Sequence, residues 1–292
     1  MNDSTAEAAR IAPVRRVLGT AARRTLVATV RRATVSQRAW PDVLVIGAQR
    51  AGTTSLWRWL TQHPAFVAPV LGMKGVHYFD LEAHRPPAWY RAHFPLRATL
   101  ARIDGRTGEA SPYYLFHPRV PGQAAAALPR STRFVAVLRD PVARAISHYH
   151  HMRDEGTEPL PTLEAALDAE PERLAAAEER LRHDPAAVDV HHMHHSYVAR
   201  GEYAGQLERW FDAVGRDRVL VLDGGRLRTD AAGLLSELCR FVGLDPALAP
   251  SPDRGVNAGR YPEAADDTVR RLRAHFAPHD ERLWELLGER WW

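Results

Sequence analysis

The segment from residue 43 to residue 55 constrains the fold of this chain more than any other. It opens with the apolar run Val-Leu-Val-Ile at 43–46, continues at once into Gly47, and becomes amphipathic from Thr53. A short continuous apolar run rich in β-branched residues is typical of a strand that is buried on both faces of a parallel sheet. The sequence therefore predicts a buried strand, a glycine-rich turn and a helix over 53–62.

The rest of the chain repeats this alternation of strand and helix. Further strands are predicted at 107–109, 134–138 and 219–222, and a helix is predicted to follow Asp140-Pro141, from Val142 to about Met152. Other helices are predicted over about 162–181, 203–214, 230–242, 264–276 and 279–287. This pattern predicts an α/β fold, a single P-loop-like domain with a central parallel sheet flanked by helices on both faces. The charged, histidine-rich stretch 155–195 is the best candidate for a mobile lid or insertion.

Composition excludes several classes of protein. The chain has 292 residues, of which 45% are hydrophobic and 25% charged, as expected of a globular protein with a sizeable core. A single cysteine, Cys239, excludes an internal disulfide framework and a zinc site built from thiolates. The longest apolar runs fall short of the roughly 20 residues that a membrane-spanning helix needs.

Basic charge is concentrated at the N-terminus. Residues 1–40 contain eight arginines and two acidic residues, whereas the whole chain carries a formal charge of only +4. Apolar residues recur every fourth position between 14 and 30, which predicts a basic amphipathic helix able to lie on an anionic membrane surface. A solvated or disordered tail is the alternative. We therefore divide the chain into a basic tail, 1–40, and a folded domain, 41–292.

The same distribution of charge bears on partners and location. Nucleic-acid binding is not expected, because the tail lacks interleaved aromatic residues and the folded domain is slightly acidic. No uninterrupted apolar segment follows the N-terminal charges, so a secretory signal is not expected either. We expect a cytoplasmic protein that contacts the inner face of the membrane through its basic segment.

The turn after the first strand has the composition of an anion-binding loop. Glycines allow its N–H groups to converge on an anion, and the following helix adds the positive end of its dipole. Its spacing, Gly-x4-Gly, is that of a nucleotide-binding P-loop, but Thr53 occupies the position of the required lysine, and the cation Arg50 precedes the second glycine, Gly52. No pair of acidic residues is evident to hold magnesium. The loop thus predicts an anion held without a metal; an incidental tight turn is the alternative.

A second anion-binding segment follows the predicted strand 134–138. Arg139 lies at its carboxyl end, where open α/β sheets bind their ligands, and Asp140-Pro141 has the pattern of a helix N-terminus. Ser147 comes eight residues later, a little over two helical turns, so its hydroxyl can join Arg139 at one phosphate. An ion pair between Arg139 and Asp140 or another acid is the alternative.

Together these segments resemble the sulfotransferases that use 3′-phosphoadenosine 5′-phosphosulfate (PAPS), most closely the glycan-modifying branch typified by the heparan sulfate sulfotransferases and its bacterial relatives. The segment Asn-Ala-Gly-Arg-Tyr-Pro at 257–262 is similar to the late loop of that family, which closes over the cofactor. The resemblance extends from about 42 to 288. It implies the following cofactor-binding residues: Arg50, Ala51, Gly52, Thr53, Thr54, Ser55, Arg139, Ser147, Gly259, Arg260 and Tyr261.

Two departures from the family pattern concern catalysis. The family usually has lysine where this chain has Arg50, which keeps the charge and can stabilise the leaving phosphate but cannot release a proton. The heparan sulfate enzymes carry a catalytic glutamate at the position of Gly75, so the expected carboxylate base is absent. We therefore predict His77 as the general base, with Asp80 orienting it or the acceptor, and Glu109 as the reserve base. A packed histidine beside two aromatic residues is the alternative for His77.

The resemblance predicts transfer of a sulfuryl group from PAPS to a hydroxyl of a glycan, glycolipid or small-molecule acceptor, with 3′-phosphoadenosine 5′-phosphate (PAP) as product and no metal. A catalytically degenerate binding protein of the same fold and a P-loop kinase are the alternatives. The histidines at 191–195 favour an acceptor-facing loop over a metal site. Lys74, the only lysine, lies beside Gly75 and is either an ordinary surface residue or a cation of the acceptor side.

Overall fold

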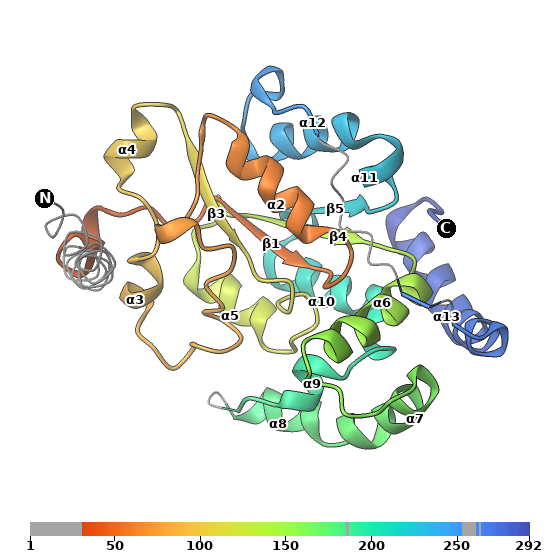
Figure 1. Ribbon diagram of the computed structural model, residues 1–292. Coiled ribbons are helices and arrows are strands. Elements are labelled where there is room, and N and C mark those ends of the chain that lie inside the picture. Colours follow the sequence, from red (N-terminus) through yellow and green to blue (C-terminus); the bar gives the residue numbers. More distant parts are fainter. Residues whose placement is uncertain (1–30, 185–186, 253–260, 263) are drawn as a thin grey trace, which may run out of the picture.

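The computed structural model describes residues 31–184, 187–252, 261–262 and 264–292. Its centre is a five-stranded parallel sheet in the order β2-β3-β1-β4-β5, which confirms the predicted α/β architecture (Figure 1). The strands are β1 (Val43–Gly47), β2 (Phe66–Val67), β3 (Arg106–Ala110), β4 (Arg133–Leu138) and β5 (Val219–Asp223).

The two central strands are the most hydrophobic ones in the sequence. Every residue of β1 is buried, and so are the residues of β4 that follow Arg133. These runs are continuous rather than alternating because helices cover the sheet on both sides. Val45 pairs with Ala110 of β3 on one side and with Val135 of β4 on the other, so β1 lies at the middle of the sheet.

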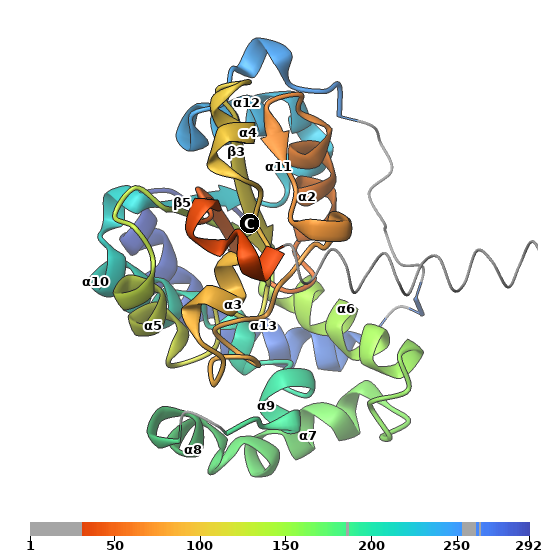
Figure 2. The same ribbon diagram turned by 90° about the vertical axis from the view of Figure 1, so that its left-hand side faces the viewer.

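Helices cover both faces of the sheet, as predicted. On one face lie α2 (Thr53–Gln62), α11 (Arg226–Thr229) and α12 (Ala231–Val242); on the other lie α5 (Val120–Ala127) and α10 (Tyr203–Val214) (Figures 1 and 2). The long α13 (Asp266–Leu287) packs against α10 and against α6 (Pro141–Asp154). Two short helices, α3 (Pro87–Arg91) and α4 (Arg97–Ala101), lie beyond the β2 end of the sheet.

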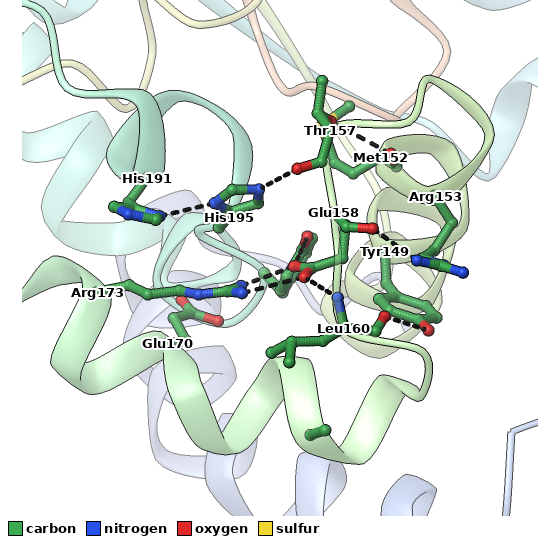
Figure 3. A network of polar contacts seen from close by, with 12 residues as sticks. Tyr149, Met152, Arg153, Thr157, Glu158, Leu160, Glu170, Arg173, His191 and His195 are labelled. Atoms are coloured by element: carbon green, nitrogen blue, oxygen red, sulfur yellow. Dashed lines mark hydrogen bonds and ion pairs between the residues drawn. The ribbon is translucent and has the colours of Figure 1, made fainter.

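The predicted lid or insertion is a separate helical layer. It contains α7 (Leu163–Leu174), α8 (Ala177–His183) and α9 (Val190–His194), which lie apart from the sheet in both views (Figures 1 and 2). Its packing is polar as well as apolar, because Arg173 donates to the buried carboxylate of Glu158 at 2.6 Å (Figure 3). The mobility of this segment stays a prediction.

Three of the predicted helices have wrong boundaries. The helix predicted over 162–181 is divided into α7 and α8, and the two helices predicted over 264–276 and 279–287 are one continuous helix, α13, with Pro278 inside it. Proline removes one backbone hydrogen bond, but Leu272, Phe276 and Leu283 form one buried stripe along α13. The packing of that stripe outweighs the local preference for a break.

Only part of the predicted tail falls within the described residues. The amphipathic helix predicted between 14 and 30 lies outside them. Residues 35–40 pack against the domain, where Arg38 is buried and donates to the carbonyl of Phe94 at 2.7 Å, while Arg91 donates to the carbonyl of Arg38 at 2.8 Å. Within the described chain, no helix combines the length and apolar character needed to cross a membrane.

Candidate functional site

The candidate site lies where β1 and β4 end side by side. The loop from Ala48 to Gly52 leaves β1, and Arg139 follows directly on β4, so both predicted anion-binding segments meet at one edge of the sheet. Parallel α/β sheets bind their ligands at this edge, because loops and helix N-termini converge there. The fold therefore brings together two sequence segments that lie about ninety residues apart.

The backbone of the first loop leaves the N-terminus of α2 open. Arg50 and Gly52 both have positive φ angles, 71° and 103°, which turn the chain sharply into the helix. In the part of the chain that is described, no side chain caps the first turn of α2. Its free N–H groups, with the hydroxyls of Thr53 and Thr54, form a cradle suited to an anion.

Arg50 connects the two anion-binding segments. Its Nε donates to the hydroxyl of Ser147 at 3.2 Å, and its carbonyl accepts from the guanidinium of Arg139 at 3.2 Å. Asp140 accepts from the backbone N–H of Ala143 at 2.8 Å and so caps α6, which carries Ser147. The predicted helix N-terminus at Asp140-Pro141 is therefore confirmed.

Tyr261 adds the third predicted segment to this cluster. Its hydroxyl lies 2.7 Å from that of Ser147, and its ring stacks on His150 at 4.9 Å between centroids. Burial raises the pKa of Tyr261. Hydrogen bonds with Ser147 and Arg50 and the charges of Arg50 and Arg139 lower it by a larger amount, so the net shift is downward. The other two predicted residues of this segment, Gly259 and Arg260, lie outside the described residues.

Lys74 reaches the cradle from a different part of the chain. Its ammonium donates to the hydroxyl of Thr53 at 3.2 Å and of Thr54 at 2.9 Å. Burial, and then the charge of Arg50, lower the pKa of Lys74 to about 8. Lys74 is therefore a partly buried residue at the cradle, and its role as a cation of the acceptor side stays a prediction. Sequence reasoning marked Lys74 as unusual but did not place it at the anion cradle.

The cradle holds positive charge that has no counterion among the described residues. Among the residues that the structure describes, no carboxylate lies within ion-pair distance of Arg50, Lys74 or Arg139. All three side chains are partly buried, which strengthens their attraction for an anion compared with full exposure to water. The arrangement therefore suits a multiply charged anion.

The segment that contains His77 is held against the end of β3 by three hydrogen bonds. The N–H of Ala110 donates to the carbonyl of Lys74 at 2.7 Å, that of Val76 to the Glu109 carboxylate at 2.6 Å, and that of His77 to the Ser111 hydroxyl at 3.2 Å. These bonds fix His77 next to the cradle, close enough for the charge of Lys74 to influence its pKa.

His77 has the geometry of an oriented histidine. Its Nδ1 lies 2.9 Å from the carboxylate of the buried Asp80, which leaves Nε2 available, and its side chain is 41% exposed. Burial lowers the pKa of His77, but the hydrogen bond and charge of Asp80, with the charge of Glu109, outweigh burial and raise it. His77 also has a positive φ of 53°, which is uncommon for a residue with a side chain.

Gly75 lies in a space that is too small for a side chain. A Cβ atom there would lie 2.8 Å from the Ala110 carbonyl oxygen, 2.8 Å from the Ser111 hydroxyl and 3.0 Å from Nε2 of His77. A larger residue at position 75 would therefore require the backbone to move. Nε2 of His77 lies close to the point where such a side chain would begin.

Glu109 is buried and surrounded by donors. One carboxylate oxygen accepts from Val76 and Ser111, and the other from the hydroxyls of Tyr90 and Tyr114 at 2.7 and 3.0 Å. Burial raises the pKa of Glu109, although these hydrogen bonds oppose the rise. The structure thus places Glu109 beneath the His77 segment rather than at its surface.

The predicted histidine-rich loop is a short helix, α9, on the other side of the cradle. His192 is buried against Phe116, with its Nδ1 2.6 Å from the hydroxyl of Tyr113. Arg200 joins this region to the anion-binding loop, because it donates to the side chain of Gln49 and to the carbonyl of His192 at 2.9 Å. Sequence reasoning missed Arg200, which no local motif marks.

Comparison with known proteins gives a consistent result. Residues 40–273 match the family model of the sulfotransferase domain. The chain is 29% identical over 277 residues to human heparan sulfate glucosamine 3-O-sulfotransferase 6, covering 87% of this chain and 73% of that protein. It is 28% identical over 273 residues to mouse bifunctional heparan sulfate N-deacetylase/N-sulfotransferase 4, covering 85% of this chain but only 30% of that longer protein.

One solved structure is similar in both fold and sequence. It is a sulfotransferase from Alicyclobacillus acidocaldarius, with a TM-score of 0.64 and 28% sequence identity. The match covers 86% of this chain and 97% of that protein.

Proposed function

The chain belongs to the sulfotransferase domain family, and on that premise we propose that it transfers the sulfuryl group of PAPS to a hydroxyl of a glycan, glycolipid or small-molecule acceptor. One observation carries the proposal. Arg50, Lys74 and Arg139 converge on the open N-terminus of α2 without a carboxylate partner among the described residues. A doubly phosphorylated nucleotide would supply the missing negative charge.

The residues present fit such a nucleotide. The helix N-terminus and the hydroxyls of Thr53 and Thr54 would hold its 5′-phosphosulfate, together with Arg50, Lys74 and the remaining loop residues Ala51, Gly52 and Ser55. Arg139 and Ser147 would hold its 3′-phosphate, and Tyr261 would close over it, as would Gly259 and Arg260 beyond the described residues. PAPS supplies the sulfuryl group, and the bond from sulfur to the 5′-phosphate oxygen breaks in the transfer. No metal has a role in this proposal.

His77 is the proposed general base. Its Nε2 would take the proton of the acceptor hydroxyl, while Asp80 at Nδ1 would hold the ring in place and stabilise the imidazolium that forms. A base placed in this way contributes a factor of roughly 10² to 10⁴ to the rate. Glu109, proposed from the sequence as the reserve base, instead serves in this proposal to position the backbone of the His77 segment.

In this proposal, Arg50 and Lys74 both stabilise the negative charge on the leaving phosphate. The guanidinium of Arg50 can present two donors to phosphate oxygens. Lys74, whose pKa is lowered to about 8, is charged at neutral pH and is able to give up a proton. A pair of this kind stabilises the negative charge that develops on the leaving oxygen.

The acceptor class is proposed from the relatives, whose names specify heparan sulfate and, in one case, the 3-O position of glucosamine. A hydroxyl acceptor suits a histidine base, because an imidazole nitrogen can take up the hydroxyl proton. We propose a cytoplasmic enzyme, with the basic segment before residue 31 as a peripheral membrane contact.

Transfer of label from ³⁵S-PAPS to a panel of hydroxylated glycans, glycolipids and small molecules tests the proposal. We expect a labelled product and the release of PAP in equal amounts. Tight binding of PAP with no labelled product across the panel would instead support the degenerate binding protein. Binding of Mg-ATP in preference to PAP would support the kinase, which has no support in the family assignment.

A further inference from the structure

A cluster of three metal-ligating side chains lies outside the proposed active site. His275 and His279 are four residues apart on α13, so both project from one face of that helix. Glu202 reaches the same point from the start of α10. Their ligand atoms all lie within 4.8 Å of one another. From this arrangement we propose that Glu202, His275 and His279 bind a divalent transition metal, with Zn²⁺ as the favoured ion.

The spacing of the ligand atoms is close to what zinc requires. Nε2 of His275 lies 3.0 Å and Nε2 of His279 lies 3.8 Å from the same carboxylate oxygen of Glu202. Zinc bonds of about 2.0 to 2.1 Å in a tetrahedral arrangement place neighbouring ligand atoms about 3.3 Å apart. Small side-chain rotations would therefore bring all three atoms into the first shell of one ion.

The orientation of the two imidazole rings agrees with a shared ligand. The rings are nearly parallel, with an interplanar angle of 25° and centroids 5.1 Å apart, and both direct Nε2 towards Glu202. Two imidazoles and one carboxylate form a ligand set that zinc accepts readily. A fourth position would remain open, and water would fill it, because the three side chains are partly exposed.

Carboxylates pair with two of the arginines near this point. Arg282, three residues beyond His279, is paired with Glu208, and Arg271, four residues before His275, is paired with Asp168 at 2.7 Å. Arg209 lines the same cavity as Glu202 and donates to the carbonyl of Phe116, so its charge opposes the ion, whereas the charge of Glu202 favours it.

A metal here would join two elements that both support the segment Arg139–Asp140. Tyr203, the residue after Glu202, donates from its hydroxyl to the Arg139 carbonyl at 2.9 Å, and Arg273 of α13 pairs with Asp140. The ion would thus fasten α13 to the start of α10 behind the anion-binding site. Its expected effect is on the stability of this contact, because none of the three ligands faces the cradle.

The test titrates the full chain, after treatment with EDTA and desalting, with Zn²⁺ by calorimetry and with Co²⁺ by visible absorption. We expect one saturable site of tetrahedral cobalt character and a rise in the thermal midpoint with Zn²⁺. His275→Ala and His279→Ala should each lower zinc affinity by at least about tenfold, and the double variant should lose the site. Glu202→Gln should weaken binding by a smaller factor.

A second pair of histidines provides a matched control. His191 and His195 also lie four residues apart, with Nδ1 atoms 2.8 Å apart, but they face each other rather than a shared carboxylate (Figure 3). The double variant His191→Ala/His195→Ala should bind zinc as the wild type does. Unchanged binding in the His275/His279 double variant, or loss of binding in this control, would overturn the proposal. A wild-type protein that binds no zinc in the titration would also overturn it.

Discussion

The two halves of the candidate site satisfy their polar groups in opposite ways. In the cradle, Arg50, Lys74 and Arg139 donate only to hydroxyls and carbonyls within the described chain, so their charges have no counterion. Beneath the His77 segment, the buried Glu109 carboxylate accepts four hydrogen bonds. The cationic side chains of the cradle thus remain for a ligand to neutralise. On the proposed acceptor side, the hydrogen bonds instead fix the backbone segment that contains His77.

This difference also explains how the two halves tolerate change from the family pattern. In the cradle, the resemblance implies lysine at position 50, where this chain has arginine, and a second cation comes from position 74. At position 75 the resemblance implies glutamate, where this chain has glycine, and the surrounding atoms leave no room for a side chain. Positive charge at the cradle can come from side chains in several parts of the chain, whereas a general base must lie within hydrogen-bond distance of the acceptor hydroxyl.

The largest expected effect is loss of the cradle charges. Arg50→Ala and Arg139→Ala should each lower kcat/KM for PAPS by at least about 10²-fold, because each removes a positive charge that would neutralise phosphate or sulfate oxygens. PAP affinity, measured by calorimetry, should fall with both. Arg102→Ala, at an exposed position on the C-terminal side of α4, is the matched control and should change neither quantity. Full activity in either cradle variant would refute the assignment of the cradle.

Removal of the proposed base should separate catalysis from cofactor binding. His77→Ala should lower kcat by about 10²- to 10⁴-fold while PAP affinity stays within about twofold, because in the proposed mechanism His77 acts on the acceptor hydroxyl and does not bind the nucleotide. The comparison of kcat with PAP affinity is the measurement. A parallel fall of both quantities would mean that His77 belongs to the cofactor site instead.

The pH profile should report the environment of His77. A base works when it is neutral, and the pKa of His77 is raised above its usual 6.5, so kcat/KM for the acceptor should fall as the pH drops through that raised value. Asp80→Asn removes the negative charge that helps to raise the pKa of His77, so the acidic limb should move to lower pH. If the acidic limb of the pH profile does not move in Asp80→Asn, a group other than His77 causes it.

Lys74→Arg should produce a smaller and more selective effect. The substitution keeps the charge but not the ability to lose a proton, so we expect kcat to fall by about tenfold with little change in PAP affinity. The pKa of Lys74 is lowered to about 8, so wild-type activity should decline above that pH as the ammonium is lost. In the arginine variant this alkaline decline should disappear; its persistence would assign the limb to another group.

The smallest expected effect is on protein stability, and it tests the close packing at position 75. Gly75→Ala places a methyl group 2.8 Å from the Ala110 carbonyl oxygen and should destabilise the protein by about 1–3 kcal/mol, measured by chemical denaturation. Gly122→Ala, where a Cβ would meet no atom within 4 Å, is the matched control. Equal stability of the two variants would contradict the packing described for the His77 segment.

Much of the fold was predictable because its signals are local. The apolar run of β1, the helix over 53–62 and the cap at Asp140-Pro141 depend on neighbouring residues, and the structure has them as predicted. The continuity of α13 through Pro278 was not predictable, because the buried stripe that stabilises it faces other elements. The two loops that hold the anion site were visible as motifs for the same local reason.

The sequence by itself determined the strand-loop-helix unit, the identity of the cations and the absence of a carboxylate at position 75. Only the tertiary structure brought Lys74 to Thr53 and Thr54, placed Glu109 beneath Val76, and assembled Glu202 with two histidines of α13. Each of these contacts joins residues distant in the chain. Their formation depends on how whole elements pack, which no short window of sequence specifies.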